Sequence, residues 1–273
     1  MPRMICAMGV FLVFCGATRA QKPPLLPEDD IAALGNELSG ETARQNLEGI
    51  ARFHRQRGSA GFHSAAELVA DRLRAYGLSD VRILQFPADG KIFYGTQRSR
   101  PAWDAEFAEL WEMYPAVPAE QEKSTEQRVS SPKIKIASYG AEPVALAEDS
   151  ESADVTADLV DVGRGGQDSD YAGKDVTGKI VLTSGQPGAV EDLALGKFAA
   201  AGIVSYAENQ KTAWSGENDN LIRWGHLQTF SGSKTFAFMV SLKTARALGD
   251  RLAEGQEVRF ACPREGWATS GKL

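Results

Sequence analysis

Residues 175–206 constrain the fold more than any other part of the chain. They open with Asp175-Val-Thr-Gly-Lys-Ile-Val-Leu-Thr-Ser-Gly-Gln-Pro-Gly, in which the short β-branched run 179–183 is bounded by turn residues. Apolar residues then recur at helical spacing over 190–201, and Gly202 stands where a helix C-cap is expected. A second β-branched run follows at 203–206. We predict a strand, a helix and a parallel strand joined by a crossover, which is almost always right-handed.

The same β-rich pattern continues on both sides of this unit. Short runs separated by turn residues predict further strands at 133–137, 157–162, 235–240 and 258–261. Residues 242–252 predict a helix with one apolar face, and Gly255 follows it. The run 103–114 fits a helix or a strand equally well, because prolines bracket it on both sides. The second half of the chain is therefore expected to be β-rich with flanking helices.

The first half has a different, helical pattern. Ser39 is a plausible N-cap for a helix that carries Ala43, Leu47, Ile50 and His54 on one face. The glycines of residues 55–61 are expected to end that helix.

A second helix is predicted from Ser64, because Ser64 and Glu67 have the spacing of a capping box. Its expected buried stripe is Val69, Leu73 and Tyr76, and a strand is expected at 81–86. This order begins an α/β layer without completing it. We therefore expect an uncovered apolar face around Val69, Leu73 and Val81.

The N-terminus predicts export. Arg3 precedes an uncharged apolar run at 4–16 and small residues up to Ala20, which is typical of a secretory signal peptide. The run is shorter than the roughly 20 residues that span a bilayer. We expect cleavage after Ala20, a mature chain that starts at Gln21, and a secreted or periplasmic protein. Residues 21–37 are predicted to be a disordered leader.

Charge and cysteine content narrow the function classes. The whole chain has 30 Lys and Arg against 36 Asp and Glu. Loss of Arg3 and Arg19 with the signal leaves 28 against 36, a net charge of −8. This balance disfavours nucleic-acid and anionic-membrane partners, which need clustered basic residues. Of three cysteines only Cys262 lies beyond the signal, so no internal disulfide is expected.

The histidines do not predict a metal site. His54, His63 and His226 are far apart in the sequence, and none has a carboxylate two residues on. A hydrolytic zinc site needs several His, Asp or Glu ligands brought together. We interpret His54 as a packed helix residue and His63 as a surface or capping residue. His226 lies in a loop flanked by tryptophan, and it is a candidate for ligand contact. No catalytic or metal-ligating residue is predicted.

The glycine-rich and tryptophan-containing loops leave two readings open. Residues 163–166 and 184–188 could hold an anion through free amides, but neither has the ending of a phosphate loop, so they are interpreted as turns. Trp214 and Trp224 stand among Asn and Asp residues. They could form a sugar-binding face or simply pin the loop. Trp214, Trp224 and His226 are the binding candidates.

Several of these blocks, in order, resemble a known family. Arg57-Gly-Ser-Ala-Gly61, the helix at 64–76 and Tyr76-Gly-Leu-Ser-Asp-Val81 resemble the opening of secreted zinc aminopeptidases and glutamate carboxypeptidases. Ala157-Asp-Leu-Val-Asp-Val-Gly163, Val176-Thr-Gly-Lys-Ile-Val-Leu182 and Phe198-Ala-Ala-Ala-Gly-Ile-Val-Ser-Tyr206 resemble the protease-associated domain inserted in many of them. The resemblance implies a mixed α/β fold, in which the inserted domain is a β-rich sandwich or open barrel with flanking helices.

The resemblance also sets expectations about chemistry. In that family two zinc ions activate a bridging water beside a glutamate base. The ligand motifs follow the inserted domain, so none maps onto this sequence and zinc is expected only with a downstream catalytic part. The expected layout is a signal at 1–20, the leader at 21–37, a peptidase segment at 38–117, a connector at 118–132, the protease-associated domain at 133–262 and the start of a catalytic domain at 263–273.

Three functional hypotheses follow. The first is a non-catalytic N-terminal portion of an exported peptidase, in which the inserted domain shapes substrate access or mediates protein contact. The second is a standalone protein-binding or glycan-binding module. The third is the first half of an active zinc aminopeptidase. The family implies a peptide or protein substrate and allows a homo-oligomer.

Overall fold

The computed structural model describes residues 25–38, 40–113, 133–207, 218–232 and 235–263. The chain divides into two compact units, Met1–Glu48 and Gly49–Leu273, which are considered separately. Within the described residues, none of the helices is long and apolar enough to cross a membrane. The signal peptide, Trp214 and the segments 118–132 and 264–273 lie outside the described residues.

Helix α1 (Glu28–Glu37) lies in the segment predicted to be a disordered leader, so that prediction is wrong for residues 28–37. Glu28, Asp29 and Asp30 occupy the first turn, where negative charge is favourable beside the positive end of the helix dipole. Its larger apolar residues, Ile31 and Leu34, remain about half exposed. Local charge placement, rather than burial, accounts for this helix.

Helices α2 (Gly40–Ala51) and α3 (Ala60–Ala75) confirm two helices in the N-terminal half, with different limits. Helix α2 ends before His54, which lies in the following loop. Helix α3 begins four residues before Ser64, so the predicted capping box is wrong. Ser59 is the cap, and its hydroxyl accepts the N–H of Phe62 at 3.1 Å. Gly61 fits in the first turn because a side chain there would overlap the carbonyl of His54.

The buried face of α3 is formed by small residues. Ala65 and Ala70 are buried, whereas Val69 and Tyr76 are exposed, so the predicted stripe of Val69, Leu73 and Tyr76 is wrong. Segment 81–86 is not a strand in the described structure, and its Ile83, Leu84 and Phe86 are exposed. A strand is stabilised by hydrogen bonds to a neighbouring strand, and segment 81–86 pairs with none of the described strands. Of the three residues expected on an uncovered apolar face, Val69 is exposed, whereas Leu73 and Val81 are half-buried.

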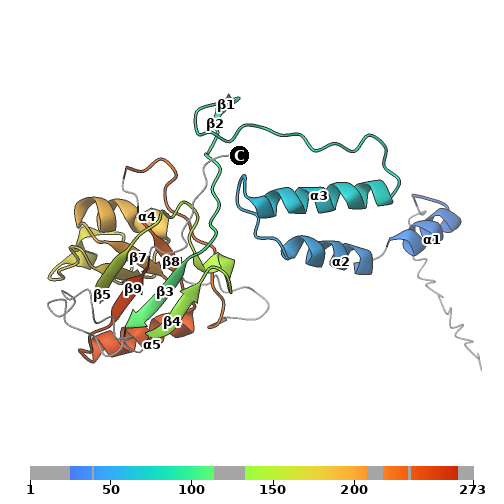
Figure 1. Ribbon diagram of the computed structural model, residues 1–273. Helices are drawn as coiled ribbons and strands as arrows, with labels where there is room; N and C mark the ends of the chain where they lie inside the picture. The colour runs from blue at the N-terminus through green and yellow to red at the C-terminus, as the bar shows by residue number, and fades with distance from the viewer. Residues whose placement is uncertain (1–24, 39, 114–132, 208–217, 233–234, 264–273) are drawn as a thin grey trace, which may run out of the picture. The chain divides into compact units, whose positions relative to one another are not determined.

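The second half forms a seven-stranded mixed sheet in the order β4-β3-β9-β5-β6-β7-β8. Figure 1 shows most of its strands side by side. Its strands are β3 (Glu109–Met113), β4 (Lys133–Ser138), β5 (Val155–Asp161), β6 (Ile180–Thr183), β7 (Gly202–Ser205), β8 (Ala237–Met239) and β9 (Arg259–Cys262). Strands β4, β3, β9 and β5 pair antiparallel, and β5, β6, β7 and β8 pair parallel. The strands predicted beyond residue 133 are confirmed. The mixed α/β class is confirmed, although the strands share one sheet rather than a two-sheet sandwich.

Alternation along the central strands divides the core into two layers. Ile180, Leu182 and Val204 point into the cluster that contains residues of α5 (Leu242–Ala253). Val181 and Ile203 point into the cluster that contains residues of α4 (Pro187–Glu191) and of the π-helical stretch η4 (Asp192–Lys197). Side chains alternate between the two faces of a strand, so a run buried on both sides needs a helical layer on each face. Helices α4 and α5 lie on opposite sides of the sheet (Figure 1).

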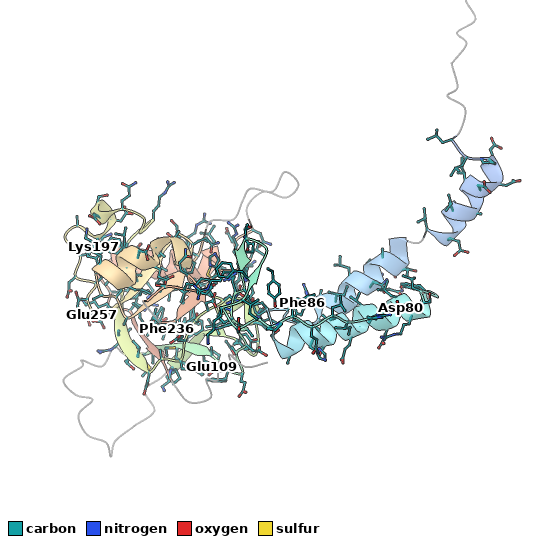
Figure 2. All side chains as sticks on the ribbon, turned by 90° about the horizontal axis from the view of Figure 1, so that it is seen from above. Asp80, Phe86, Glu109, Lys197, Phe236 and Glu257 are labelled. Atoms are coloured by element: carbon teal, nitrogen blue, oxygen red, sulfur yellow. The ribbon has the colours of Figure 1, made fainter. Side chains whose placement is uncertain are left out.

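Gly202 begins strand β7 and is not the predicted helix C-cap. The helical stretch ends earlier, at Phe198, and Ala199 takes the left-handed backbone conformation with φ 52°. A side chain at Gly202 would overlap the ring of Phe236, which is fully buried in the sheet body (Figure 2). This glycine is therefore required by close packing rather than by chain reversal.

Short elements complete the sheet body. Strands β1 (Phe93–Tyr94) and β2 (Gln97–Arg98) form a separate hairpin, turned at Gly95 with φ 64°. The ambiguous run 103–114 contains strand β3. The short 3-10 helices η2 (Pro143–Ala145) and η3 (Asp168–Tyr171) lie in the connections before β5 and before β6.

Replacement of Gly202 by alanine is expected to destabilise the protein by about 1 to 3 kcal/mol, because the new methyl group must displace the Phe236 ring in a packed core. Urea unfolding measures the effect. Gly166→Ala is the matched control, since open space surrounds that position and its φ is not positive. It is expected to change stability by less than about 0.5 kcal/mol. Equal effects at the two glycines would contradict the packing explanation.

Candidate functional site

A solvent-open pocket of about 600 Å³ lies beside the loop that carries His226. This volume is within the range of about 300 to 1,000 Å³ typical of small-molecule sites. Its walls come from three separate parts of the chain: Arg100, Asp192 at the start of η4, and His226, Gln228, Thr229, Phe230 and Ser231 of the loop.

The loop stands over the carboxyl ends of the parallel strands. A Cβ atom at Gly188, in the helix that follows β6, would lie 3.0 Å from the carbonyl oxygen of His226. A side chain at Gly225 would overlap Met239, the last residue of β8. Ligands of open α/β sheets bind outside the carboxyl ends of the strands. The pocket therefore lies at the edge of the sheet where this architecture places binding sites.

Backbone pairing holds His226 in place. The N–H of Leu227 donates to the Glu148 carbonyl, and the N–H of Glu148 donates to the Gly225 carbonyl, both at 2.9 Å. The Nδ1 atom of His226 lies 3.1 Å from the carbonyl oxygen of Leu227. A carbonyl can only accept, so Nδ1 carries a proton, and in the neutral ring Nε2 offers a lone pair. The partly exposed ring of Trp224 packs beside His226 with centroids 5.0 Å apart.

Arg100 is held on two of its three nitrogens. Its Nε donates to Thr229 Oγ1 at 2.6 Å, and its Nη2 donates to Asp149 Oδ2 at 2.8 Å. The Thr229 hydroxyl donates to the same Asp149 oxygen at 2.8 Å. These bonds orient the guanidinium group before any ligand arrives, which lowers the entropy lost on binding.

Asp149 belongs to a largely buried ion cluster that we call the Arg57 cluster: Arg57, Arg100, Glu148 and Asp149. Arg57 pairs with both Glu148 and Asp149. The two carboxylate side chains are 6% and 10% exposed. Burial lowers the pKa of Arg57, and the nearby charge of Asp149 opposes that shift. Asp149 also has φ 67°, a left-handed conformation that Asp tolerates better than most residues.

Within residues 49–273, the Arg57 cluster joins the loop before α3 to the turn at Glu148 and Asp149. Arg57 precedes α3, whereas Glu148 and Asp149 lie beside the loop that carries His226. Close by, the indole Nε1 of Trp103 donates to the Ser150 carbonyl at 3.0 Å, and the N–H of Trp103 donates to the Arg57 carbonyl at 3.0 Å. Asp149 thus binds both Arg100, which lines the pocket, and Arg57, which lies in the loop before α3.

Glu191 binds the backbone of the pocket loop from the interior of the protein. Its side chain is fully buried, and Oε2 accepts the backbone N–H of Gln228 at 2.7 Å. The Gln228 side chain in turn donates from Nε2 to the Gly188 carbonyl at 2.8 Å. Helix α4 and the loop are therefore tied together at Gln228.

The structure places the predicted site residues as follows. His226 lines the pocket and Trp224 packs beside its ring, whereas Trp214 lies outside the described residues. His63 lies on the exposed surface of α3, and its Nε2 is 3.1 Å from Glu67. The described histidines are not brought together. Among the described residues, no group of three or more His, Cys, Asp or Glu is placed to hold a metal ion.

Sequence reasoning missed Arg100, Asp192, Gln228 and Thr229. No local motif marks them, because Arg100 reaches Thr229 across 129 positions of sequence. The only signal near them is the aromatic and histidine content of the loop. Residues 163–166 form a turn after β5, whereas residues 184–186 bend after β6 and Pro187 and Gly188 begin α4, so the turn interpretation of 184–188 holds only for its first part. Thr183 Oγ1 donates to the Arg164 carbonyl at 2.9 Å.

Comparison with known proteins gives low-identity structural matches. No protein-family model matches the sequence, and no curated protein matches it. An aminopeptidase from Aneurinibacillus sp. is 17% identical with a TM-score of 0.41, over 85% of this chain and 45% of that one. A peptidase precursor from Shewanella amazonensis is 13% identical with a TM-score of 0.47, over 83% and 48%. A zinc aminopeptidase from Bacillus subtilis is 15% identical with a TM-score of 0.43, over 84% and 45%. The chain spans less than half the length of these structures.

Replacement of Asp149 by asparagine is expected to lower the free energy of unfolding by about 3 kcal/mol, because it removes one of the two carboxylates that pair with the largely buried guanidinium of Arg57. Asparagine tolerates positive φ, so the backbone is not the cause. Asp80→Asn is the matched control. Asp80 also has positive φ, 58°, but its pair with Arg82 is exposed, so a change within about 1 kcal/mol is expected. Urea unfolding of both variants provides the test, and a small effect at Asp149 would contradict a structural role for the cluster.

His54 is expected to make stability depend on pH. It lies in the loop after α2, with its ring 5.5 Å from that of Tyr139 in an edge-on contact. Burial lowers the pKa of His54 below its usual 6.5, and Asp104 opposes the shift. The unfolded chain therefore binds the proton more readily, so stability is lost as pH falls below about 6.5.

The measurement is the free energy of unfolding between pH 8 and pH 5 for the wild type and for His54→Gln. The wild type is expected to lose more stability on acidification, by at most about 1.4 kcal/mol per pH unit for one proton. The difference between the proteins at pH 8 corrects for lost packing. Parallel curves would show that His54 does not contribute to the pH dependence.

Proposed function

We propose that this chain is the non-catalytic N-terminal portion of an exported zinc-dependent peptidase of the aminopeptidase type. Residues 133–262 would be a protease-associated domain that shapes access of a peptide or protein substrate, or mediates protein contacts. The proposal begins from the ordered sequence blocks that resemble that family. The observation that carries it is the Arg57 cluster.

The Arg57 cluster supports a fixed placement of residues 133–262 relative to the loop before α3, which belongs to the same compact unit. A domain that shapes a substrate cleft must keep its orientation, whereas a domain on a free tether does not. Arg57 belongs to the motif Arg57-Gly-Ser-Ala-Gly61 of the peptidase-like segment, and its partners Glu148 and Asp149 belong to the sheet body. Breaking such a buried pair costs several kcal/mol, so the junction is stiff.

The apolar surface near α3 is a second support. Val69, Leu84 and Phe86 are 40%, 70% and 65% exposed. Residues of this kind are usually covered in a complete α/β layer. Coverage by further peptidase structure accounts for this surface and for the missing partner of segment 81–86.

The proposal assigns no zinc ligand to this chain, in keeping with the finding that no three His, Cys, Asp or Glu residues of the described segments gather to hold a metal ion. No catalytic step is therefore assigned to this chain. In this proposal zinc would bind only to a downstream catalytic part, and a homo-oligomer stays a prediction.

A binding module is the second candidate, and the pocket beside Trp224 and His226 favours it. In this alternative the loop contacts a protein or glycan directly. Substitution of Trp224 would then reduce binding of the partner. Binding unchanged by Trp224→Ala would count against it.

The first experiment tests the assignment of activity. Purified residues 21–273 are expected to release no amino acids from an unblocked peptide in the presence of zinc, with a known zinc aminopeptidase assayed in parallel. A product that continues past Leu273 with a His-x-Asp motif is expected to be active. Zinc-dependent release by residues 21–273 alone would overturn the proposal.

The second experiment tests export. N-terminal sequencing of the protein from the medium or periplasm is expected to begin at Gln21, because signal peptidase recognises the small residues Thr18 and Ala20 before the cleavage site. An uncleaved chain retained in the cytoplasm would contradict the predicted signal.

A further inference from the structure

The pocket beside His226 presents groups of opposite charge that are available to a ligand. Asp192 is exposed on one wall and makes no ion pair with any described residue. On another wall Arg100 uses Nε and Nη2 to bind Thr229 and Asp149. Its Nη1 makes no hydrogen bond to a described residue, so two N–H donors remain for a ligand.

The remaining walls are suited to a small polar molecule with an apolar group. Phe230 is half exposed, and the guanidinium group of Arg98 lies 4.1 Å from its ring centroid, which fixes the ring. His226 offers its Nε2 lone pair in the neutral form. The buried contact of Glu191 with Gln228 keeps this part of the loop from shifting.

These features discriminate among ligand classes. A phosphorylated ligand is disfavoured by the carboxylate of Asp192, and a metal ion by the lack of a ligand set among the described residues. A neutral sugar would leave both charges unused. A molecule with a carboxylate at one end and an ammonium group at the other can form a charge-assisted hydrogen bond with Arg100 and a second one with Asp192.

We propose that this pocket binds a short peptide with free ends as a zwitterion. The C-terminal carboxylate of the peptide accepts hydrogen bonds from Nη1 of Arg100, and its N-terminal ammonium group donates to the Asp192 carboxylate. An apolar side chain of the peptide packs on the ring of Phe230. The site depends on the pocket alone and not on the peptidase assignment, so the two proposals can fail separately. It would place a peptide-end receptor on the sheet body itself.

The test is titration of the whole chain with the dipeptide Ala-Phe, followed by calorimetry and by NMR shifts of the pocket residues. Saturable binding is expected, with shifts centred on residues 226–231. N-acetyl-Ala-Phe and Ala-Phe-amide, which lack one charge each, are expected to bind about tenfold more weakly. Equal affinity for the three peptides, or no saturable binding of Ala-Phe, would overturn the proposal.

Two variants test which pocket residue binds each end of the peptide. Asp192→Asn is expected to lose the discrimination against the acetylated peptide while keeping that against the amide, and Arg100→Gln the reverse. Arg100→Lys separates loss of charge from loss of the Asp149 contact, since it keeps the charge but not the planar geometry. Asp175→Asn and Arg82→Gln are charge-matched controls on exposed positions and should leave both preferences unchanged. Discrimination that survives in both pocket variants would contradict the assigned orientation.

Discussion

The Arg57 cluster is the interaction on which the arrangement of residues 49–273 depends. Two guanidinium groups and two carboxylates meet where the segment before α3, the turn at Glu148 and the loop at Thr229 converge. Removing charges from water is costly, and the cost is offset only when each has a partner. The cluster therefore specifies one arrangement of three distant segments. It also orients Arg100, so the shape of the pocket depends on the same contacts.

The sheet body is organised by a simpler constraint. Residues such as Ile180 and Val181 are consecutive, apolar and fully buried, so they need cover on both faces. Helix α5 supplies one layer, and α4 with η4 supplies the other. The junction of α4 and η4 then places Asp192 at the pocket and the buried Glu191 against the backbone of the pocket loop. Scaffold and candidate site thus share their elements, although the scaffold residues carry no chemistry of their own.

The strand predictions beyond residue 133, which rest on patterns of neighbouring residues, were confirmed, whereas several features that depend on distant residues were predicted wrongly or not at all. Strands β6 and β7 were predictable because β-branched runs between turn residues report burial within a few positions. The capping residue of α3 was misjudged, because both Ser59 and Ser64 can cap and the choice depends on the fit of Gly61 against His54. The segment 81–86 has strand composition, yet a strand exists only with a partner. Trp224 and His226 were identifiable from an aromatic loop, whereas Arg100 and Asp192 have no local signature.

The sequence by itself determined the alternation of apolar residues, and hence the β-rich second half, the helix predicted at 242–252 and the mixed α/β class. It also determined the charge balance and the single cysteine beyond the predicted signal. Only the tertiary structure decided that Gly202 packs against Phe236, that Arg57 meets Asp149, and that Arg100, Asp192 and His226 line one pocket. The reason is the separation of the residues along the sequence. Apolar periodicity arises within a single helix or strand, whereas these ion pairs and this pocket join residues that are distant in the sequence and meet only in the fold.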